Sequence, residues 1–153
     1  MHRRTLIQAA AIAAPYTAML AMGVLPRRSV ASWPADAFRA EDLADAQRLL
    51  FGARAIKDSD RIMIDAPDIA ENGRVVPIDV RIELPEPASL TLLSDANPFP
   101  LLARAHFTPA VAPRLSVRVK MGSSGNVIAI VDSGGELHHT MRSIKVTAGG
   151  CGG

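Results

Sequence analysis

Cys151 is the residue of this chain best suited to covalent chemistry, because it is the only cysteine among 153 residues. A glycine pair stands on each side of it, Gly149-Gly150 before and Gly152-Gly153 after. Glycine has no Cβ and loses more conformational freedom on ordering than other residues, so we expect a flexible arm. A thiol on such an arm could attach a cargo or another protein covalently. The same sequence would also suit a frayed chain end.

The other polar residues do not complete an enzyme's active site. His138 and His139 are adjacent, and adjacent residues of a strand face opposite sides, so they cannot chelate one metal ion together. A cysteine hydrolase would need Cys151 held near a histidine and an oxyanion hole, which a glycine tether opposes. Phosphate-binding glycine loops and the G-x-S-x-G elbow are missing from the sequence. We therefore predict a carrier without catalytic residues, metal or cofactor of its own.

The basic character of the chain comes from its first residues. Residues 1–31 hold four of the 17 basic side chains and none of the 15 acidic ones, so the remainder has a formal charge of −2. That remainder shows neither a stripe of Lys and Arg nor interleaved aromatic residues. The high pI of about 9.1 therefore does not indicate a nucleic-acid partner.

Residues 1–31 are typical of an export signal. Arg3 and Arg4 precede an apolar, alanine-rich stretch, and small residues before Ser32 suit cleavage there. Paired arginines before such a stretch indicate a twin-arginine signal peptide, which exports folded protein to the periplasm. Pro15 interrupts the stretch, which argues against a retained membrane anchor. An odd cysteine in an exported protein indicates either intermolecular pairing or a free reactive thiol.

The mature chain should begin with a helical segment over residues 36–51. Asp36 is a suitable N-cap and Gly52 a suitable stop, and the apolar residues between them recur at spacings of three and four. The pattern fits one short helix, or two helices broken near Ala40. We expect this segment to cover part of a sheet rather than to bind a partner.

From Arg61 onward the hydrophobic period changes to two, which predicts strands. Pro77 cannot donate to a ladder, so its strand should begin at a sheet edge or contain a bulge. Turns rich in Gly, Pro and Asn separate seven short strands, which predicts an antiparallel β-sandwich over residues 32–147, followed by the arm at 148–153. The predicted strands cover residues 61–66, 76–84, 89–93, 101–107, 115–121, 127–131 and 137–146.

Four stretches of the chain carry a resemblance to a known family. They are residues 145–153, which contain the arm, residues 66–77, residues 97–100 and residues 118–121. Together with the twin-arginine leader, these stretches resemble the SoxY family, the sulfur-carrying subunits of the Sox thiosulfate-oxidation system. The resemblance covers roughly residues 36–153.

This resemblance implies an immunoglobulin-like β-sandwich that forms a heterodimer with a second sandwich subunit, SoxZ. It implies that Cys151 is the covalent attachment site for sulfur and that Gly149, Gly150, Gly152 and Gly153 give partner enzymes access to it. In the family, a c-type cytochrome complex joins thiosulfate to the arm. A manganese-dependent hydrolase then releases sulfate, and a sulfane dehydrogenase acts on the remaining sulfur. The chain itself would be no enzyme, and would contact neither nucleic acid nor, after leader cleavage, a membrane.

Two other interpretations remain open from the residues alone. The chain could be an exported structural or adhesion module whose tail cysteine forms an intermolecular disulfide. It could also be a thiol enzyme that acts without partners. The sequence shows which residues share a strand face, but not which face is the core and which meets a partner.

Overall fold

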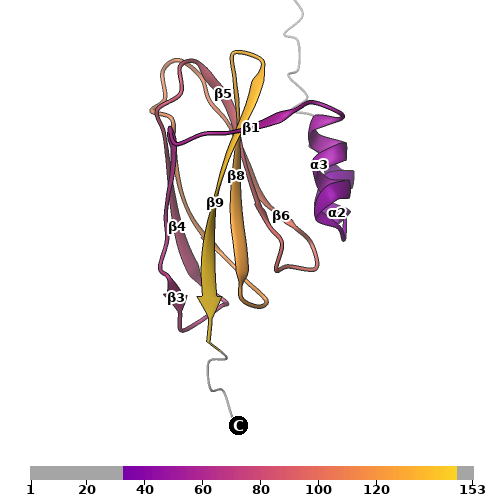
Figure 1. Ribbon diagram of the computed structural model, residues 1–153, viewed down its shortest axis with the longest axis vertical. Helices are drawn as coiled ribbons and strands as arrows, with labels where there is room; N and C mark the ends of the chain where they lie inside the picture. The colour runs from indigo at the N-terminus through magenta and orange to yellow at the C-terminus, as the bar shows by residue number, and fades with distance from the viewer. Residues whose placement is uncertain (1–32, 148–153) are drawn as a thin grey trace, which may run out of the picture. The chain divides into compact units, whose positions relative to one another are not determined.

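Two β-sheets pack face to face in the structure, a computed structural model that describes residues 33–147 (Figure 1). The larger sheet has the strand order β1-β9-β8-β5-β6, and a short strand, β3, also pairs with β9. The smaller sheet has the order β2-β4-β7. Every pairing among the seven predicted strands is antiparallel, so the predicted sandwich is confirmed.

The strand bounds follow the predicted ones closely. The larger sheet consists of β1 (Ile56–Asp58), β3 (Ile69–Ala70), β5 (Pro87–Ser94), β6 (Leu101–His106), β8 (Gly125–Ser133) and β9 (Glu136–Val146). The smaller sheet consists of β2 (Ile62–Asp65), β4 (Val76–Ile82) and β7 (Arg114–Val119).

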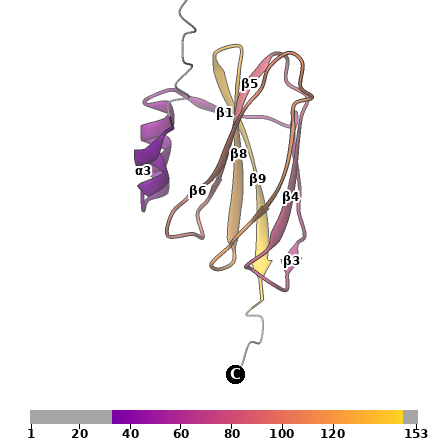
Figure 2. The same ribbon diagram turned by 180° about the vertical axis from the view of Figure 1, so that it is seen from behind.

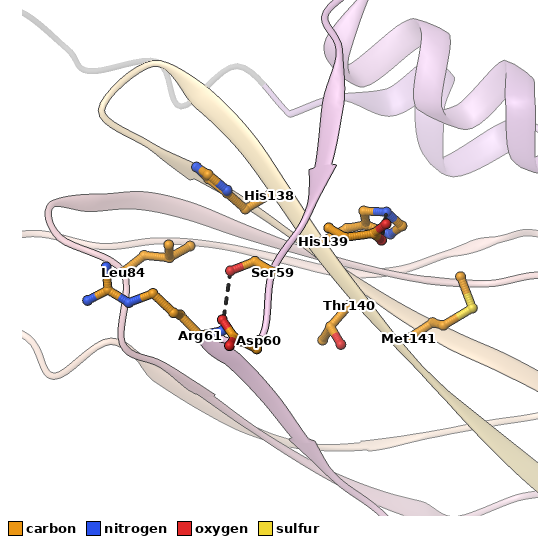
Figure 3. Close-up of a pocket in the computed structure, with 9 residues that line it drawn as sticks. Ser59, Asp60, Arg61, Leu84, His138, His139, Thr140 and Met141 are labelled. Atoms are coloured by element: carbon orange, nitrogen blue, oxygen red, sulfur yellow. Dashed lines mark hydrogen bonds and ion pairs between the residues drawn. The ribbon is translucent and has the colours of Figure 1, made fainter.

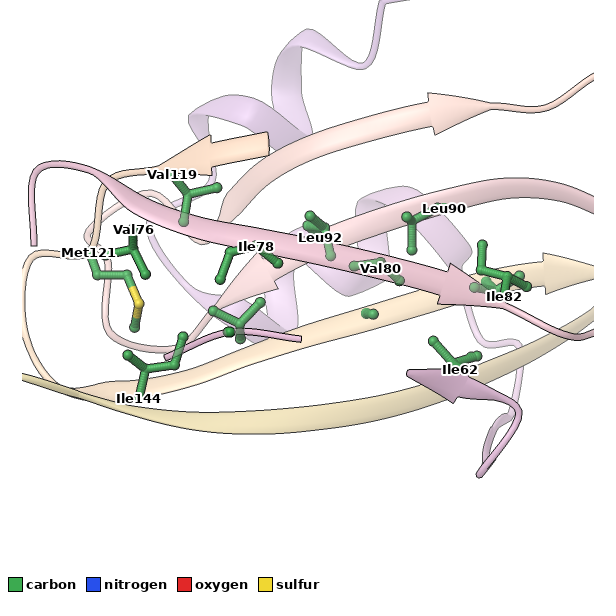
Figure 4. Packing of buried hydrophobic residues seen from close by; sticks show 14 of the residues in the cluster. Ile62, Val76, Ile78, Val80, Ile82, Leu90, Leu92, Val119, Met121 and Ile144 are labelled. Carbon is green, nitrogen blue, oxygen red and sulfur yellow. The ribbon is translucent and has the colours of Figure 1, made fainter. Parts of the chain in front are cut away.

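Strict alternation along β4 decides which of its faces is the core. Val76, Ile78 and Val80 are fully buried, whereas Asp79 and Arg81 between and beyond them are exposed. The buried side chains meet Leu90 and Leu92 of β5 and other apolar residues between the sheets (Figure 4). Full burial of such a side chain stabilises the fold by roughly 1.5–3 kcal/mol, so this face fixes the register of the smaller sheet.

Two strands were missed from the sequence, because two or three residues are too few to show a hydrophobic period. β1 pairs with residues 137–139 of β9 and β3 with residues 145–146, and both pairings are parallel. Between them the chain leaves the larger sheet, runs through the smaller sheet as β2, and returns. The larger sheet is therefore not wholly antiparallel.

The helical segment consists of two helices, α2 (Ala35–Arg39) and α3 (Leu43–Phe51), so the break near Ala40 is confirmed. The N-cap prediction was wrong: Asp36 lies inside α2. Asp42 caps α3 instead, accepting hydrogen bonds from the backbone N–H groups of Ala44 (2.8 Å) and Asp45 (3.1 Å). Gly52 ends α3 with φ +64°, a conformation that favours glycine.

The helices cover the face of the larger sheet that points away from β4, as Figures 1 and 2 show from opposite sides. Ala37, Ala46 and Phe51 are buried there against Leu93 and Ile130 of the sheet. Leu49 points away and is 47% exposed, so it is not part of this contact. Within residues 33–147, no helix is both long and apolar enough to cross a membrane.

Pro77 lies in the middle strand of the smaller sheet, not in an edge strand. The strand still has only one neighbour at that point, because β2 pairs with residues 79–82 of β4 alone. On the other side Pro77 lies opposite Arg118 of β7. The missing N–H therefore costs no hydrogen bond toward β2.

Candidate functional site

The predicted attachment site lies outside the described residues. This holds for Cys151 and for the flanking Gly149, Gly150, Gly152 and Gly153, as it does for the predicted signal peptide. The structure describes the chain up to Thr147, which directly follows β9. The described part of the candidate site is therefore its base, the end of β9 and the loops around it.

The end of β9 is held on both sides up to its last residues. On one side, the N–H groups of Lys145 and Thr147 donate to the carbonyl oxygens of Asp68 (2.9 Å) and Ala70 (3.1 Å). On the other side, the N–H of Val146 donates to Oγ of Ser124 (2.9 Å). The chain is thus fixed to within four residues of Cys151.

Gly73 allows three segments to meet at this base. A Cβ on Gly73 would lie 2.6 Å from the carbonyl oxygen of Met121 and 2.7 Å from Cγ1 of Val146. Such contacts are closer than side chains tolerate, so only glycine fits here. The N–H of Met121 donates to the carbonyl oxygen of Gly73 at 2.7 Å. Sequence reasoning found only a turn at Asn72-Gly73, because its contact partners are distant in the chain.

Asn97 ties two further loops together at the same end of the sandwich. Its Nδ2 donates to the carbonyl oxygen of Lys120 (2.7 Å), and its Oδ1 accepts from the N–H of Gly122 (2.8 Å). The loop after β5 is thereby joined to the loop after β7. An amide side chain is needed for this pair of bonds, since it both donates and accepts.

The four stretches singled out in the sequence therefore meet at one place. Residues 66–77 bond to the end of β9 through Asp68 and Ala70 and to Met121 through Gly73. Residues 97–100 bond to residues 118–121 through Asn97. Their common position surrounds the point at which the chain continues toward Cys151.

Arg142 adds an ion pair to this base. Its Nη2 lies 2.7 Å from Oδ1 of Asp68 and 3.5 Å from the carbonyl oxygen of Ala66. Both side chains are well exposed, so the pair contributes about 1 kcal/mol or less. The pair holds residues 66–68, which precede β3, against β9.

A hollow of about 580 Å³ lies toward the opposite end of β9 (Figure 3). Residues from the link between β1 and β2 and from β9 line it, among them Arg61, His138, His139 and Met141. His138 and His139 point to opposite sides of the strand, as predicted. His139 Nε2 lies 2.8 Å from Oδ1 of Asp58. Across residues 33–147, no three His, Cys, Asp or Glu side chains come together as metal ligands.

The thiol of the same chain cannot reach this hollow. Met141, its lining residue nearest the arm, lies six residues before Thr147, a strand distance of about 20 Å. The four residues from Thr147 to Cys151 span at most about 14 Å when fully extended. The hollow is therefore no cargo pocket for Cys151 of its own chain.

Charged pairs fasten the hairpin between β8 and β9 at that far end. Arg54 donates to Asp132 (2.7 Å) and to the carbonyl oxygen of Gly135 (2.7 Å). The hydrogen bond with Asp132 raises the pKa of Arg54. Lys57 donates to Glu136 at 2.7 Å, and this hydrogen bond lowers the pKa of the Glu136 carboxyl. These groups are paired with each other and are not arranged around a reactive atom.

Comparison with known proteins gives a matching family and solved structures of similar fold. The family described as "Sulfur oxidation protein SoxY" matches residues 47–151. Among solved structures, the sulfur carrier protein SoxY from Chlorobium limicola f thiosulfatophilum is 36% identical with a TM-score of 0.64. That match covers 69% of this chain and 96% of the other. A search of curated proteins returned no match.

A second solved structure shares the fold alone. Superoxide reductase (neelaredoxin) from Ignicoccus hospitalis has a TM-score of 0.53 at 21% identity, over 60% of this chain and 94% of that one. At this identity the likeness concerns the arrangement of strands and not the chemistry.

Proposed function

Because the chain belongs to the SoxY family of sulfur oxidation proteins, we propose that it is a periplasmic carrier that holds sulfur covalently on Cys151. The observation that carries this proposal is the fastening of β9 at Lys145, Val146 and Thr147. It fixes the base of a short arm that contains the only cysteine of the chain.

The proposed chemistry begins with an oxidation. The Cys151 thiolate and thiosulfate form a new S–S bond and give up two electrons, which a c-type cytochrome complex accepts. Hydrolysis then breaks the bond between the sulfane and sulfone sulfur atoms. Water supplies one oxygen, sulfate and two protons leave, and a persulfide remains on Cys151. A hydrolase catalyses this step, and a sulfane dehydrogenase oxidises the remaining sulfur.

The length of the arm explains how carrier and enzymes divide the work. An extended arm projects its thiol at most about 14 Å beyond Thr147, which is enough to enter a channel in a partner enzyme. Glycines on both sides of Cys151 leave such a channel free of side-chain clashes. Catalytic groups belong to the partner enzymes. SoxZ is the permanent partner of the carrier. Export through the twin-arginine leader would carry SoxZ along as part of the folded complex.

Intact-mass measurement of the protein purified from its host tests this proposal. We expect additions on Cys151 that correspond to bound thiosulfate or sulfur and that a reductant removes, because both are held through S–S bonds. The Cys151→Ser variant is the matched control, and it should lose the additions and thiosulfate-dependent respiration while keeping its fold.

Two outcomes would contradict the proposal. If the only reductant-sensitive product is a dimer of two protein chains, Cys151 forms an intermolecular disulfide and the chain is a structural module. If Cys151→Ser supports thiosulfate oxidation at the normal rate, the attachment site lies elsewhere.

A further inference from the structure

One edge of β9 is open over part of its length. On the side away from β8, β1 pairs with residues 137–139 and β3 pairs with residues 145–146. Between these two pairings, residues 140–144 have no hydrogen-bonded strand neighbour on that side within the described part of the chain, although β2 of the smaller sheet passes close to β9. The gap exists because the chain between β1 and β3 crosses to the smaller sheet.

Hydrogen bonds at both ends of the gap determine which backbone groups face it. The carbonyl oxygen of His139 accepts from Ser59 (2.9 Å), and the N–H of Lys145 donates to Asp68 (2.9 Å). Groups on a strand alternate in direction, so the N–H and C=O groups of Met141 and Ser143 point the same way. Both residues are exposed, Met141 by 57%. Two donors and two acceptors therefore face the gap, at the spacing of an extended chain.

The dimensions of the gap restrict what can enter it. From His139 to Lys145 it measures about 20 Å along β9, and β1 and β3 close its two ends. A strand of an intact sheet, as long as β9 itself, is therefore excluded. A loop or chain end that is extended over about three residues fits, because it can enter from the open side.

The side chains around the gap indicate which residues suit it. Met141 lies on the outer face and offers apolar surface to a neighbour. Arg142, on the opposite face, uses Nη2 for Asp68, and its Nε is buried without a partner within the described residues, so that only the guanidinium's outer nitrogens can meet an incoming group. An incoming segment with a carboxylate beside Arg142 and apolar residues on either side complements both the charge of Arg142 and the apolar surface of Met141. The hollow of Figure 3 adjoins the β1 end of the gap, at Thr140 and Met141.

We propose that the gap between β1 and β3 is a docking site for a partner protein, which adds an extended apolar–acidic–apolar segment as a short strand paired with Met141 and Ser143. The docking does not depend on the proposed sulfur chemistry. It would, however, serve that chemistry. Ser143 lies four residues, or about 13 Å, before Thr147, so a partner bound there is within reach of Cys151.

Amide hydrogen exchange of the full chain, followed by NMR, tests the open edge. In the free protein, the amides of Met141 and Ser143 should exchange at least about tenfold faster than those of Thr140 and Arg142, which face β8. Equal protection of all four amides would mean that the gap is filled, and would overturn the proposal.

The acetylated peptide Gly-Val-Asp-Val-Gly, added at millimolar concentration, tests the docking. It should slow exchange at Met141 and Ser143 and leave Thr140 unchanged, because its backbone takes up only the groups in the gap. Absence of protection at these two amides overturns the proposal, as does protection spread over the whole sheet.

Three variants keep the peptide test free of folding effects. Ser143→Pro removes a donor that faces the gap but none that faces β8, so the thermal midpoint should be kept while peptide protection at Met141 is lost. Ser143→Ala keeps the donor and should bind normally. Met141→Glu leaves the backbone intact and should weaken binding of the acidic peptide by about threefold through like-charge repulsion. Unchanged binding by Ser143→Pro would refute strand addition.

Discussion

Single residues at the base of the arm are held by contacts that their neighbours in sequence do not reveal. Gly73 appears in the sequence as the second residue of an Asn-Gly turn, and it does follow Asn72 in a turn. Its more important property is the lack of a Cβ between Met121 and Val146. One glycine thereby lets the smaller sheet and the end of β9 approach each other.

Gly73→Ala should destabilise the domain by about 1–3 kcal/mol, because the new methyl group meets the backbone of Met121 and forces it to move. Urea unfolding measures the loss. Gly122→Ala is the matched control, since its Cβ would meet Ala96 and Asn97 only at ordinary distances of 3.6 and 3.7 Å. Similar losses for both variants would show that the close contact at Gly73 is not the cause.

Residue types alone predicted the candidate site but not its base. Cys151 and its four glycines are predicted because a lone thiol between glycines is rare and chemically specific, and this stays a prediction because they lie outside the described residues. The partners of Gly73, Asn97 and Asp68 could not be found in this way. Each depends on a contact between residues far apart in the chain, which no local pattern encodes.

At the scale of elements, helix α3 shows how a cap can be assigned to the wrong aspartate. Asp36 and Asp42 both precede apolar residues at helical spacing. The chain breaks at Ala40, whose ψ of 133° is extended, so the second aspartate begins a new helix. Either residue satisfied the sequence rule, and only the position of the break decided between them.

Asp42→Ala should lower stability by about 0.5–2 kcal/mol, because the N–H groups of Ala44 and Asp45 lose their acceptor. Thermal unfolding followed by circular dichroism measures the change. The control, Asp36→Ala, makes the same change inside α2. It should alter stability by less than about 0.5 kcal/mol. A larger loss for Asp36→Ala would restore the sequence-based assignment of the cap.

Strands were predictable in proportion to their length. β4, β7 and β9 alternate over six or more residues and were found with nearly their observed bounds. β1 and β3 have three and two residues, so they contain no period to detect. Their parallel pairing with β9 depends on the chain's route between the two sheets, which is a property of the whole fold.

At the scale of the whole molecule, the sandwich has two chemically different ends. One end gathers the loops around Thr147, and the other contains the hairpin between β8 and β9, with the hollow beside His138 and His139. The two ends lie at opposite ends of β9. Ionisable groups at the far end should therefore not influence the Cys151 thiol. The reactivity of Cys151 in the isolated chain should then not depend on the groups at that far end.

Replacing both His138 and His139 by Gln should leave the pH dependence of Cys151 alkylation by iodoacetamide unchanged, since neither imidazole is within reach of the thiolate. The alkylation rate between pH 6 and 10 is the measurement, and the same protein's thermal midpoint controls for folding. A shift of the profile in the double variant would place one of these histidines beside Cys151 and contradict the separation of the two ends.

The position of β9 also has a mechanical consequence. A pull along the axis of β9, as a partner drawing on Cys151 would exert under the proposed function, acts on a strand that lies between β8 on one side and β1 and β3 on the other. Such a pull loads the hydrogen bonds of these ladders in shear, so that many must break together before the strand moves. A pull across a sheet edge would instead open them one at a time. Under the proposed function, cargo transfer would therefore load the domain in the direction in which its C-terminal strand resists unravelling.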